Sequence, residues 1–245
     1  MSGRELFDAS EQGDSKKVKE LLDKKADVNY KDNYGWTPLH IARGSTPLHI
    51  AAYNGHEETA ALLVSHGANT EATNNEGWTP LHGAAWYGHK ETAAVLVSLG
   101  ANIEAKDRAG MTPLHYAAWN GDQETAAVLV SHGANIEATN NDGDTPLHIA
   151  AYNYRMEIAA LFVSLGANID AKNNNGSTPL HFAVPDCSRR SPYIAELLLQ
   201  HGARVSANSR GLTPLHIAAN TGSLQILLLV VDSIMKSEVS ADEPK

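Results

Sequence analysis

Histidine is the residue type in this sequence with the widest capacity for chemistry. The chain has twelve histidines, and an imidazole can act as a general acid, a general base or a metal ligand. Seven of them close copies of one string, Thr-Pro-Leu-His, and the other five also recur next to glycines. A histidine that returns at a fixed position of a repeated string is expected to be a hydrogen-bonding support rather than a ligand. The seven are His40, His49, His82, His115, His148, His181 and His216.

Other patterns that could support catalysis or metal binding are weak. A zinc site needs cysteines and histidines at short spacing, and the sequence has no such cluster. Cys187 is the single cysteine, and His181 is its only conceivable base, but no third residue is placed to orient the pair. Glycines stand at repeat turns rather than in a phosphate-binding loop. We therefore expect no catalytic residue, no metal and no cofactor.

The net charge, the apolar runs and the single cysteine limit the compartments in which the protein can act and the classes of partner that it can bind. The net charge of −9 and the pI of about 5.7 disfavour binding to a phosphate backbone. The longest apolar run, 226–231, is too short to cross a bilayer, and the first residues carry no apolar signal core. One cysteine fits a reducing compartment. These observations predict a cytoplasmic protein with no membrane span and no nucleic-acid partner, and we expect a monomer.

The elements that position these residues come from a repeat. Five copies of Thr-Pro-Leu-His, from Thr46 to Thr178, follow one another in steps of 33 residues, whereas the first step is 9 residues and the last is 35. The copies begin at Thr37, Thr46, Thr79, Thr112, Thr145, Thr178 and Thr213.

One repeat, 79–111, predicts two helices and an extended stretch. Thr79 can cap a helix whose first position is Pro80, where a missing N–H costs nothing. A mid-repeat Gly88 ends this helix, and a second helix ends at Gly100 in the position of a left-handed cap. The turn-rich stretch that follows is called the finger below. One such unit cannot bury its apolar face alone, so the units are expected to stack into a solenoid.

This pattern resembles the ankyrin repeat. Residues 46–56, Thr-Pro-Leu-His-Ile-Ala-Ala-Tyr-Asn-Gly-His, match it throughout, and the later Leu-x-x-x-Gly-Ala completes it. The resemblance implies an all-α solenoid of stacked helix–turn–helix repeats with β-turn fingers, in a single domain over 1–236. The repeats are expected at 4–36 (N-terminal cap), 46–78, 79–111, 112–144, 145–177, 178–212 and 213–236 (C-terminal partial repeat), with 37–45 as a partial, duplicated segment and 237–245 as a disordered tail.

Several segments depart from the pattern. Two first helices cannot stack without a second helix between them, so Thr46–Tyr53 is expected to be the true helix, and 37–45 an enlarged finger that flexes at Gly44-Ser45. Tyr154-Arg155 replaces the usual Gly-His, and 185–192 lengthens a turn, so local distortion is expected at both places. The lysines of 16–25 predict a solvated cap face. In the last helix, Leu228 stands where a polar residue is expected. That helix either closes the stack imperfectly or contacts a partner or a second copy.

The ankyrin resemblance also implies where a partner binds: at the finger tips and at the exposed end of each first helix, along a concave groove. All four tryptophans and half of the eight tyrosines fall at these positions. Aromatic residues interleaved with Asn, Asp and Glu are typical of protein-binding surfaces. The expected partner-binding residues are Tyr34, Trp36, Tyr53, Asn54, Glu76, Trp78, Trp86, Tyr87, Arg108, Met111, Trp119, Asn120, Asp144 and Tyr152. For Trp36 and Trp78 the alternative is that they brace neighbouring fingers.

The predicted function is therefore a non-enzymatic protein-interaction module, an adaptor, scaffold or inhibitor. The acidic groove favours a partner protein with a basic or apolar segment. Two alternatives remain open: a targeting fragment of a larger ankyrin protein, and a structural homo-oligomer that forms through the apolar C-terminal helix.

Overall fold

The computed structural model describes residues 3–32, 44–184 and 192–241, with side chains as far as Met235. Contacts between residues divide the chain into two compact units, Met1–Asn140 and Asn141–Lys245. Each unit is described by itself. The boundary lies in the finger of the predicted repeat 112–144. Among the described residues, no helix combines the length and apolar character needed to cross a membrane.

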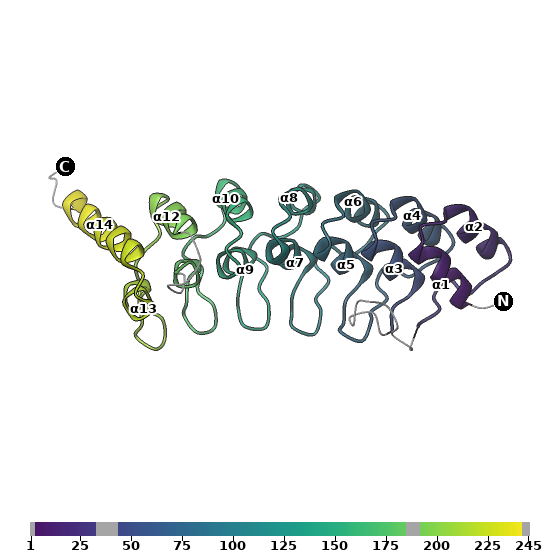
Figure 1. The fold of residues 1–245 in the computed structure, drawn as a ribbon, viewed down its shortest axis with the longest axis horizontal. Helices are drawn as coiled ribbons and strands as arrows, with labels where there is room; N and C mark the ends of the chain where they lie inside the picture. Colours follow the sequence, from purple (N-terminus) through teal and green to yellow (C-terminus); the bar gives the residue numbers. More distant parts are fainter. Residues whose placement is uncertain (1–2, 33–43, 185–191, 242–245) are drawn as a thin grey trace. The chain divides into compact units, whose positions relative to one another are not determined.

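The first unit is built from four helix pairs, and each second helix has 9 residues. Figure 1 shows its first helices, α1, α3, α5 and α7, in one row and the second helices, α2, α4, α6 and α8, in another. The fingers extend beyond the row of first helices. The bounds are α1 (Gly3–Glu11), α2 (Ser15–Asp23), α3 (Pro47–Tyr53), α4 (Glu57–Ser65), α5 (Pro80–Trp86), α6 (Lys90–Ser98), α7 (Pro113–Asn120) and α8 (Gln123–Ser131).

The Thr-Pro-Leu-His string starts the first helices α3, α5 and α7 as the sequence predicts, whereas α1 lacks it. In α3, Thr46 is the cap and Pro47 takes the first position. The Nδ1 atom of His49 accepts hydrogen bonds from the backbone N–H and the hydroxyl of Thr46, at 3.2 and 2.8 Å. The threonine and the histidine thus satisfy groups that the helix end leaves free. The mid-repeat glycine then ends the helix with a positive φ, +73° at Gly55, which favours glycine.

The core runs through the unit as two columns of leucine and alanine. From α3 to α8, one leucine of each helix is at most 1% exposed. Alanines beside them are equally buried, and their small side chains allow neighbouring helix pairs to approach closely. The leucines of the two columns are Leu48, Leu81 and Leu114, and Leu63, Leu96 and Leu129.

A single side chain at the base of each finger organises its turn. The Oδ1 atom of Asn74 accepts the backbone N–H of Glu76 and of Trp78, both at 2.9 Å. The backbone N–H of Asn74 donates to the carbonyl of Trp78 at 3.0 Å. Asp107, Asn173 and Asn208 repeat this arrangement in later fingers.

The finger that contains the duplicated segment closes in the same way. The N–H of Asp32 donates to the carbonyl of Ser45 at 3.0 Å, and the N–H of Gly44 donates to Asp32 at 2.8 Å. Ser45 is completely buried. The expectation that Gly44-Ser45 is a flexible point was therefore wrong, because these residues form the closing side of the turn. Residues 33–43 lie outside the described part of the chain.

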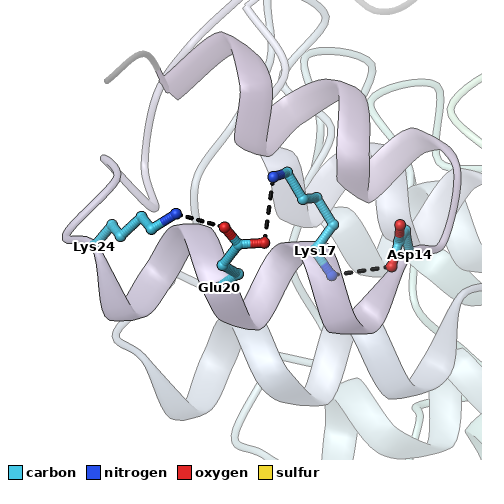
Figure 2. A network of polar contacts seen from close by, with 4 residues as sticks. All are labelled: Asp14, Lys17, Glu20 and Lys24. Atoms are coloured by element: carbon cyan, nitrogen blue, oxygen red, sulfur yellow. Dashed lines mark hydrogen bonds and ion pairs between the residues drawn. The ribbon is translucent and has the colours of Figure 1, made fainter.

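The charged face of the first repeat is locally paired. In Figure 2, the Oδ1 atom of Asp14 accepts the backbone N–H of Lys17 at 2.9 Å, and Glu20 forms ion pairs with Lys17 and Lys24. Hydrogen bonds from Lys24 and Lys17 lower the pKa of Glu20. All three of the paired side chains are about half exposed. Exposed pairs of this kind contribute little to stability, so the contacts fit the solvated cap face that the sequence predicts.

The second unit repeats the pattern with more variation. Its helices are α9 (Pro146–Tyr152), α10 (Met156–Ser164), α11 (Pro179–Phe182), α12 (Tyr193–Gln200), α13 (Pro214–Thr221) and α14 (Leu224–Ala241). The short α11 precedes residues 185–191, which lie outside the described residues. The helix α14 runs on to Ala241, past the point where the tail 237–245 was expected to begin. The prediction of a tail from residue 237 was therefore wrong as far as Ala241.

The expected distortion at Tyr154-Arg155 was also wrong. Tyr154 takes the left-handed φ of +56° that glycine takes in other repeats. The N–H of Arg155 donates to the carbonyl of Ala150 at 2.9 Å, as that of His56 does to Ala51. The turn keeps its backbone hydrogen bonds although a non-glycine residue takes the left-handed conformation, which is strained.

Candidate protein-binding surface

The buried histidines hold fingers onto helices. The Nε2–H of His49 donates to the carbonyl of Trp78 at 2.8 Å, while its Nδ1 accepts from Thr46. Burial lowers the pKa of His49 to about 4, so the ring is neutral. His82, His148 and His181 form the same bond to the finger that follows, at 3.1 Å in each case. The prediction that these histidines are supports was confirmed.

A second row of histidines connects neighbouring repeats. The Nε2 atom of His56 bonds to the carbonyl of Glu11 at 3.0 Å, and that of His89 bonds to the carbonyl of Tyr53 at 2.9 Å. These ring nitrogens are thus engaged by the backbone. Within the described residues, no three histidine, cysteine or acidic side chains gather as they would around a metal ion.

Trp78 lies at the centre of an aromatic cluster in the first unit. Its ring centroid is 4.5 Å from that of Tyr116, and its Nε1–H donates to the Tyr116 hydroxyl at 2.9 Å. The hydroxyl of Tyr116 in turn donates to the Asp107 carboxylate. Burial and the carboxylate together raise the pKa of Tyr116. The chain of hydrogen bonds joins two fingers through one helix and fixes the orientation of each ring.

Tyr53 extends the cluster on the other side. Its hydroxyl accepts a hydrogen bond from Nδ2 of Asn74 at 2.9 Å, and its ring is 6.4 Å from Trp78 between centroids. Gly83 makes room for this ring, because a Cβ at that position would lie 2.0 Å from the Tyr53 ring carbons. The glycine sits inside α5, where its only evident purpose is this close approach.

Three aromatic residues of the cluster reach the surface. Trp86 and Tyr87 are half-buried, and Trp119 is 38% exposed. The ring centroids of Trp86 and Trp119 are 6.1 Å apart, and Trp86 packs at 5.5 Å on Tyr116. We call Trp86, Tyr87 and Trp119 the exposed aromatic surface. The buried rings behind Trp86 and Tyr87 limit their motion, so a ligand would pay little conformational entropy to order them.

Polar residues occupy the predicted positions around this surface. Asn54, Glu76, Arg108 and Asn120 are exposed. Glu76 is near enough to Tyr116 to raise the pKa of its hydroxyl. Apolar rings beside exposed amide and charged groups give a surface that can combine apolar contact with hydrogen bonding.

Of the other residues predicted to bind a partner, three are buried supports and two lie outside the described residues. Tyr53, Trp78 and Met111 are only 5–6% exposed, so they brace fingers and helices and do not themselves face solvent. For these three residues the expectation of direct partner contact was wrong, and for Trp78 the bracing alternative holds. Tyr34 and Trp36 lie outside the described residues. Ser45, not Trp36, precedes the threonine that caps α3.

Two predicted residues lie in the second unit. Tyr152 is 57% exposed, and its ring packs edge-on against Phe182 at 6.0 Å. Asp144 accepts a hydrogen bond from Nδ2 of Asn173 at 2.8 Å. These contacts belong to the second unit alone, so they are kept apart from the exposed aromatic surface.

Sequence reasoning missed Tyr116 and Gly83. Both occupy the position after Thr-Pro-Leu-His, which holds isoleucine in three other repeats. The signal was available, since a glycine within a predicted helix indicates a close approach of another group. Its partner could not be named, because the partner comes from the preceding repeat.

Known proteins share the repeat pattern of this chain. The family described as "Ankyrin repeats (3 copies)" matches residues 6–107, 114–208 and 174–241, which together span most of the chain. The chain belongs to the ankyrin-repeat family. Ankyrin repeats are a protein-interaction module, which accords with the non-catalytic roles of the histidines.

Solved and curated ankyrin proteins show how far the likeness reaches. The human ASB11 ankyrin repeat domain superposes with a TM-score of 0.77 at 27% identity, over 92% of this chain and 96% of that one. Protein phosphatase 1 regulatory subunit 27 of Homo sapiens is 38% identical over 72 residues, 29% of this chain and 41% of the relative. SMC5-SMC6 complex localization factor protein 1 of Bos taurus is 39% identical over 66 residues, 17% of this chain and 6% of that protein. The matched segments thus make up less than half of the two curated relatives, the regulatory subunit and the localization factor.

Proposed function

We propose that this ankyrin-repeat protein captures another protein through the exposed aromatic surface of its first unit, as an adaptor, scaffold or inhibitor without catalytic chemistry of its own. The observation that carries the proposal is that the half-buried Trp86 and the exposed Trp119 lie on top of a hydrogen-bonded aromatic base. Tryptophan and tyrosine dominate the energetics of protein interfaces when they are held rigidly.

The chemistry of the partner follows from charge and from the rings. The chain carries a net charge of −9, and Glu76 stands exposed at the finger tip that precedes α5. A partner segment with basic and apolar side chains would satisfy both the carboxylate and the rings, and arginine or lysine also binds favourably to the faces of tryptophan. The human relative is named a regulatory subunit, and that name supports regulation through binding as a class of function. We place the action in the cytoplasm on the basis of the single cysteine.

Substitution of the two tryptophans tests the proposal. Trp86→Ala with Trp119→Ala removes the exposed rings, and each loss should cost about 2 kcal/mol of binding free energy, so affinity should fall at least about a hundredfold. The measurement compares proteins retained from a native lysate by the wild-type chain and by the variant, with affinities of retained partners measured by calorimetry.

The control substitutes apolar residues of similar exposure elsewhere. Leu99→Ala with Leu165→Ala alters residues that are 41% and 48% exposed at the ends of second helices. Helical content by circular dichroism should be unchanged in both variants. If the tryptophan variant retains the same partners with the same affinity, the exposed aromatic surface is not the binding site.

A further inference from the structure

The last helix of the second unit carries an uncovered apolar stripe. Four of its large apolar side chains are exposed: Leu224 at 66%, Leu228 at 58%, Val231 at 44% and Met235 at 58%. They are separated by four, three and four residues, which places them on one face of α14. The opposite face is packed on α12 and α13, since Ile226 and Val230 are completely buried. The stripe is therefore a second apolar surface of a helix that is already held in place.

The length of α14 sets this helix apart from the other second helices. The second helices α4, α6, α8 and α10 each have 9 residues, whereas α14 has 18. Ile234 stands where the other repeats have a glycine of positive φ, such as Gly67 and Gly100. Without that glycine the helix continues, and Met235 is added to the stripe.

The residues of the stripe also differ from their equivalents in earlier repeats. Leu224 stands where α4 has Glu57, and Leu228 where it has Ala61. Between Leu224 and Met235 the only charged residue is Asp232, so almost nothing on this part of the helix favours solvent. An exposed stripe of this kind marks an interaction site.

The first helix of the last repeat, α13, is also more exposed than the equivalent helices of earlier repeats. Leu215 and His216 of α13 are half-exposed and exposed, whereas the equivalent leucines and histidines from Leu48 to His181 are at most 5% exposed. In the part of the chain that the structure describes, no carbonyl meets the Nε2 atom of His216. Within the second unit, the last repeat thus presents the face by which the repeats before it contact the following repeat.

We propose that a second copy of this chain covers the stripe, with the two α14 helices antiparallel about a two-fold axis. The spacing of four, three and four residues reads the same from both ends. An antiparallel copy therefore places Leu224 opposite Met235 and Leu228 opposite Val231, so every apolar residue faces another. The spacing is also that of a coiled-coil seam, which lets such residues interdigitate.

Other surfaces of the chain do not complement the stripe as well. The helices α1 and α2 carry none of the exposed large apolar side chains found among the described residues, and Glu5, Lys16 and Lys19 are exposed there. A head-to-tail contact would cover leucine and methionine with charged groups. Because each copy has a net charge of −9, the dimer should be strengthened by salt, which screens the repulsion and favours burial of apolar area.

Light scattering of the purified chain over micromolar to millimolar concentrations tests the proposal. The mass should rise from 26.2 kDa toward twice that value with concentration, and rise further with added salt. Leu228→Glu with Met235→Glu should hold the mass at that of one chain, and Leu228→Ala with Met235→Ala should weaken the dimer at least tenfold. Leu99→Glu with Leu165→Glu, at residues of 41% and 48% exposure, should still dimerise.

Three outcomes would overturn the dimer. These are a single-chain mass for the wild type at every concentration, a persistent dimer in the Leu228→Glu, Met235→Glu variant whose circular dichroism is unchanged, and loss of the dimer in the Leu99→Glu, Leu165→Glu control. The dimer does not depend on the exposed aromatic surface, so Trp86→Ala with Trp119→Ala should leave the mass unaffected.

Discussion

The exposed aromatic surface and the stripe on α14 are both apolar surfaces, but they are built differently. Behind Trp86 and Tyr87 stand buried rings that hydrogen bonds hold in one arrangement, through Asn74, Tyr116 and Asp107. The stripe lies on a helix that packs on α12 and α13, and its four residues are leucine, valine and methionine, which carry no N–H, O–H or carbonyl group in their side chains to orient a ligand. Rigid rings among polar groups suit recognition of a particular partner, whereas a self-complementary aliphatic stripe suits association with an identical copy.

The same contrast extends to the histidines. His49 and His82 are buried supports that tie helices to the fingers around the aromatic cluster, while His216 near the stripe is exposed. The interior of the first unit therefore holds neutral imidazoles at these two positions, because burial lowers the pKa of His49 and of His82. The following predictions exploit this difference.

The largest expected effect is a loss of stability in acid that comes from His49. Its pKa of about 4 in the folded state is below the usual 6.5, so between these values the unfolded chain binds more protons. The contribution of neutral His49 to the free energy of unfolding should thus be complete above pH 6.5. As the pH falls toward 4, His49 alone should lower the free energy of unfolding by about 1.4 kcal/mol per pH unit. Urea unfolding followed by tryptophan fluorescence measures the slope.

The matched pair for that experiment is His49→Gln and His216→Gln. The first variant should be less stable at neutral pH and should lose part of the pH dependence, because a glutamine has no proton to gain. The second variant removes an exposed histidine that bonds to Thr213 at the start of α13, and it should keep the pH slope that comes from His49. A pH slope that is the same in His49→Gln and in the wild type would contradict the role given to the buried imidazole.

The next effect concerns the fit of Tyr53 against α5. Alanine in place of glycine within a helix usually adds about 1 kcal/mol of stability. In Gly83→Ala, however, the new Cβ would lie 2.0 Å from the Tyr53 ring, and overpacking should make the variant about 1–2 kcal/mol less stable than wild type. Thermal unfolding by calorimetry would measure the change.

A double-mutant cycle separates the clash from other causes. In a Tyr53→Ala background the ring is gone, so the added Gly83→Ala should be neutral or stabilising. Partner capture should weaken in Gly83→Ala alone, because a displaced Tyr53 disturbs the support of Tyr87, whereas the dimer at α14 should be unaffected. An equal loss of stability in both backgrounds would show that the clash with Tyr53 is not the cause.

The smallest effect lies at the turn where the first and last repeats both lack the usual glycine. Lys25 takes a left-handed φ of +59° where later repeats have Gly67 and Gly100, while Ile234 continues its helix. A β-branched side chain is excluded from this conformation more strongly than lysine is. Lys25→Gly should therefore raise the free energy of unfolding by about 1 kcal/mol, measured in urea.

Gly100→Lys is the reverse of that substitution. Nothing lies within 4 Å of a Cβ built at Gly100, whose φ is +92°, so the variant tests backbone strain without a clash. It should lose about as much stability as Lys25→Gly gains. If Lys25→Gly is instead less stable than the wild type, contacts of the lysine outweigh the strain.

The sequence predicted the parts of this protein that depend on local chemistry. Thr46 and Pro47 start a helix, Gly55 ends it, and the period of 33 residues identifies the ankyrin fold. The histidines could be interpreted as supports because each one has a fixed place in the period. The exposure of Trp119 and the partial exposure of Trp86 agree with their register, since the end of the first helix lies at the same place in each repeat.

Only the tertiary structure decided which side chains of neighbouring repeats contact one another. Trp78 and Met111 stand at finger positions that register makes exposed, yet they are buried because Tyr116 and the neighbouring finger cover them. Gly83 has a purpose only once the ring of Tyr53 is seen against it. Tyr154 keeps a glycine-like turn, with a φ of +56°, which its residue type does not favour. A repeated sequence determines the shape of each repeat. The side chains that differ from one repeat to the next contact each other between neighbouring repeats, so their partners are set by packing rather than by position along the chain.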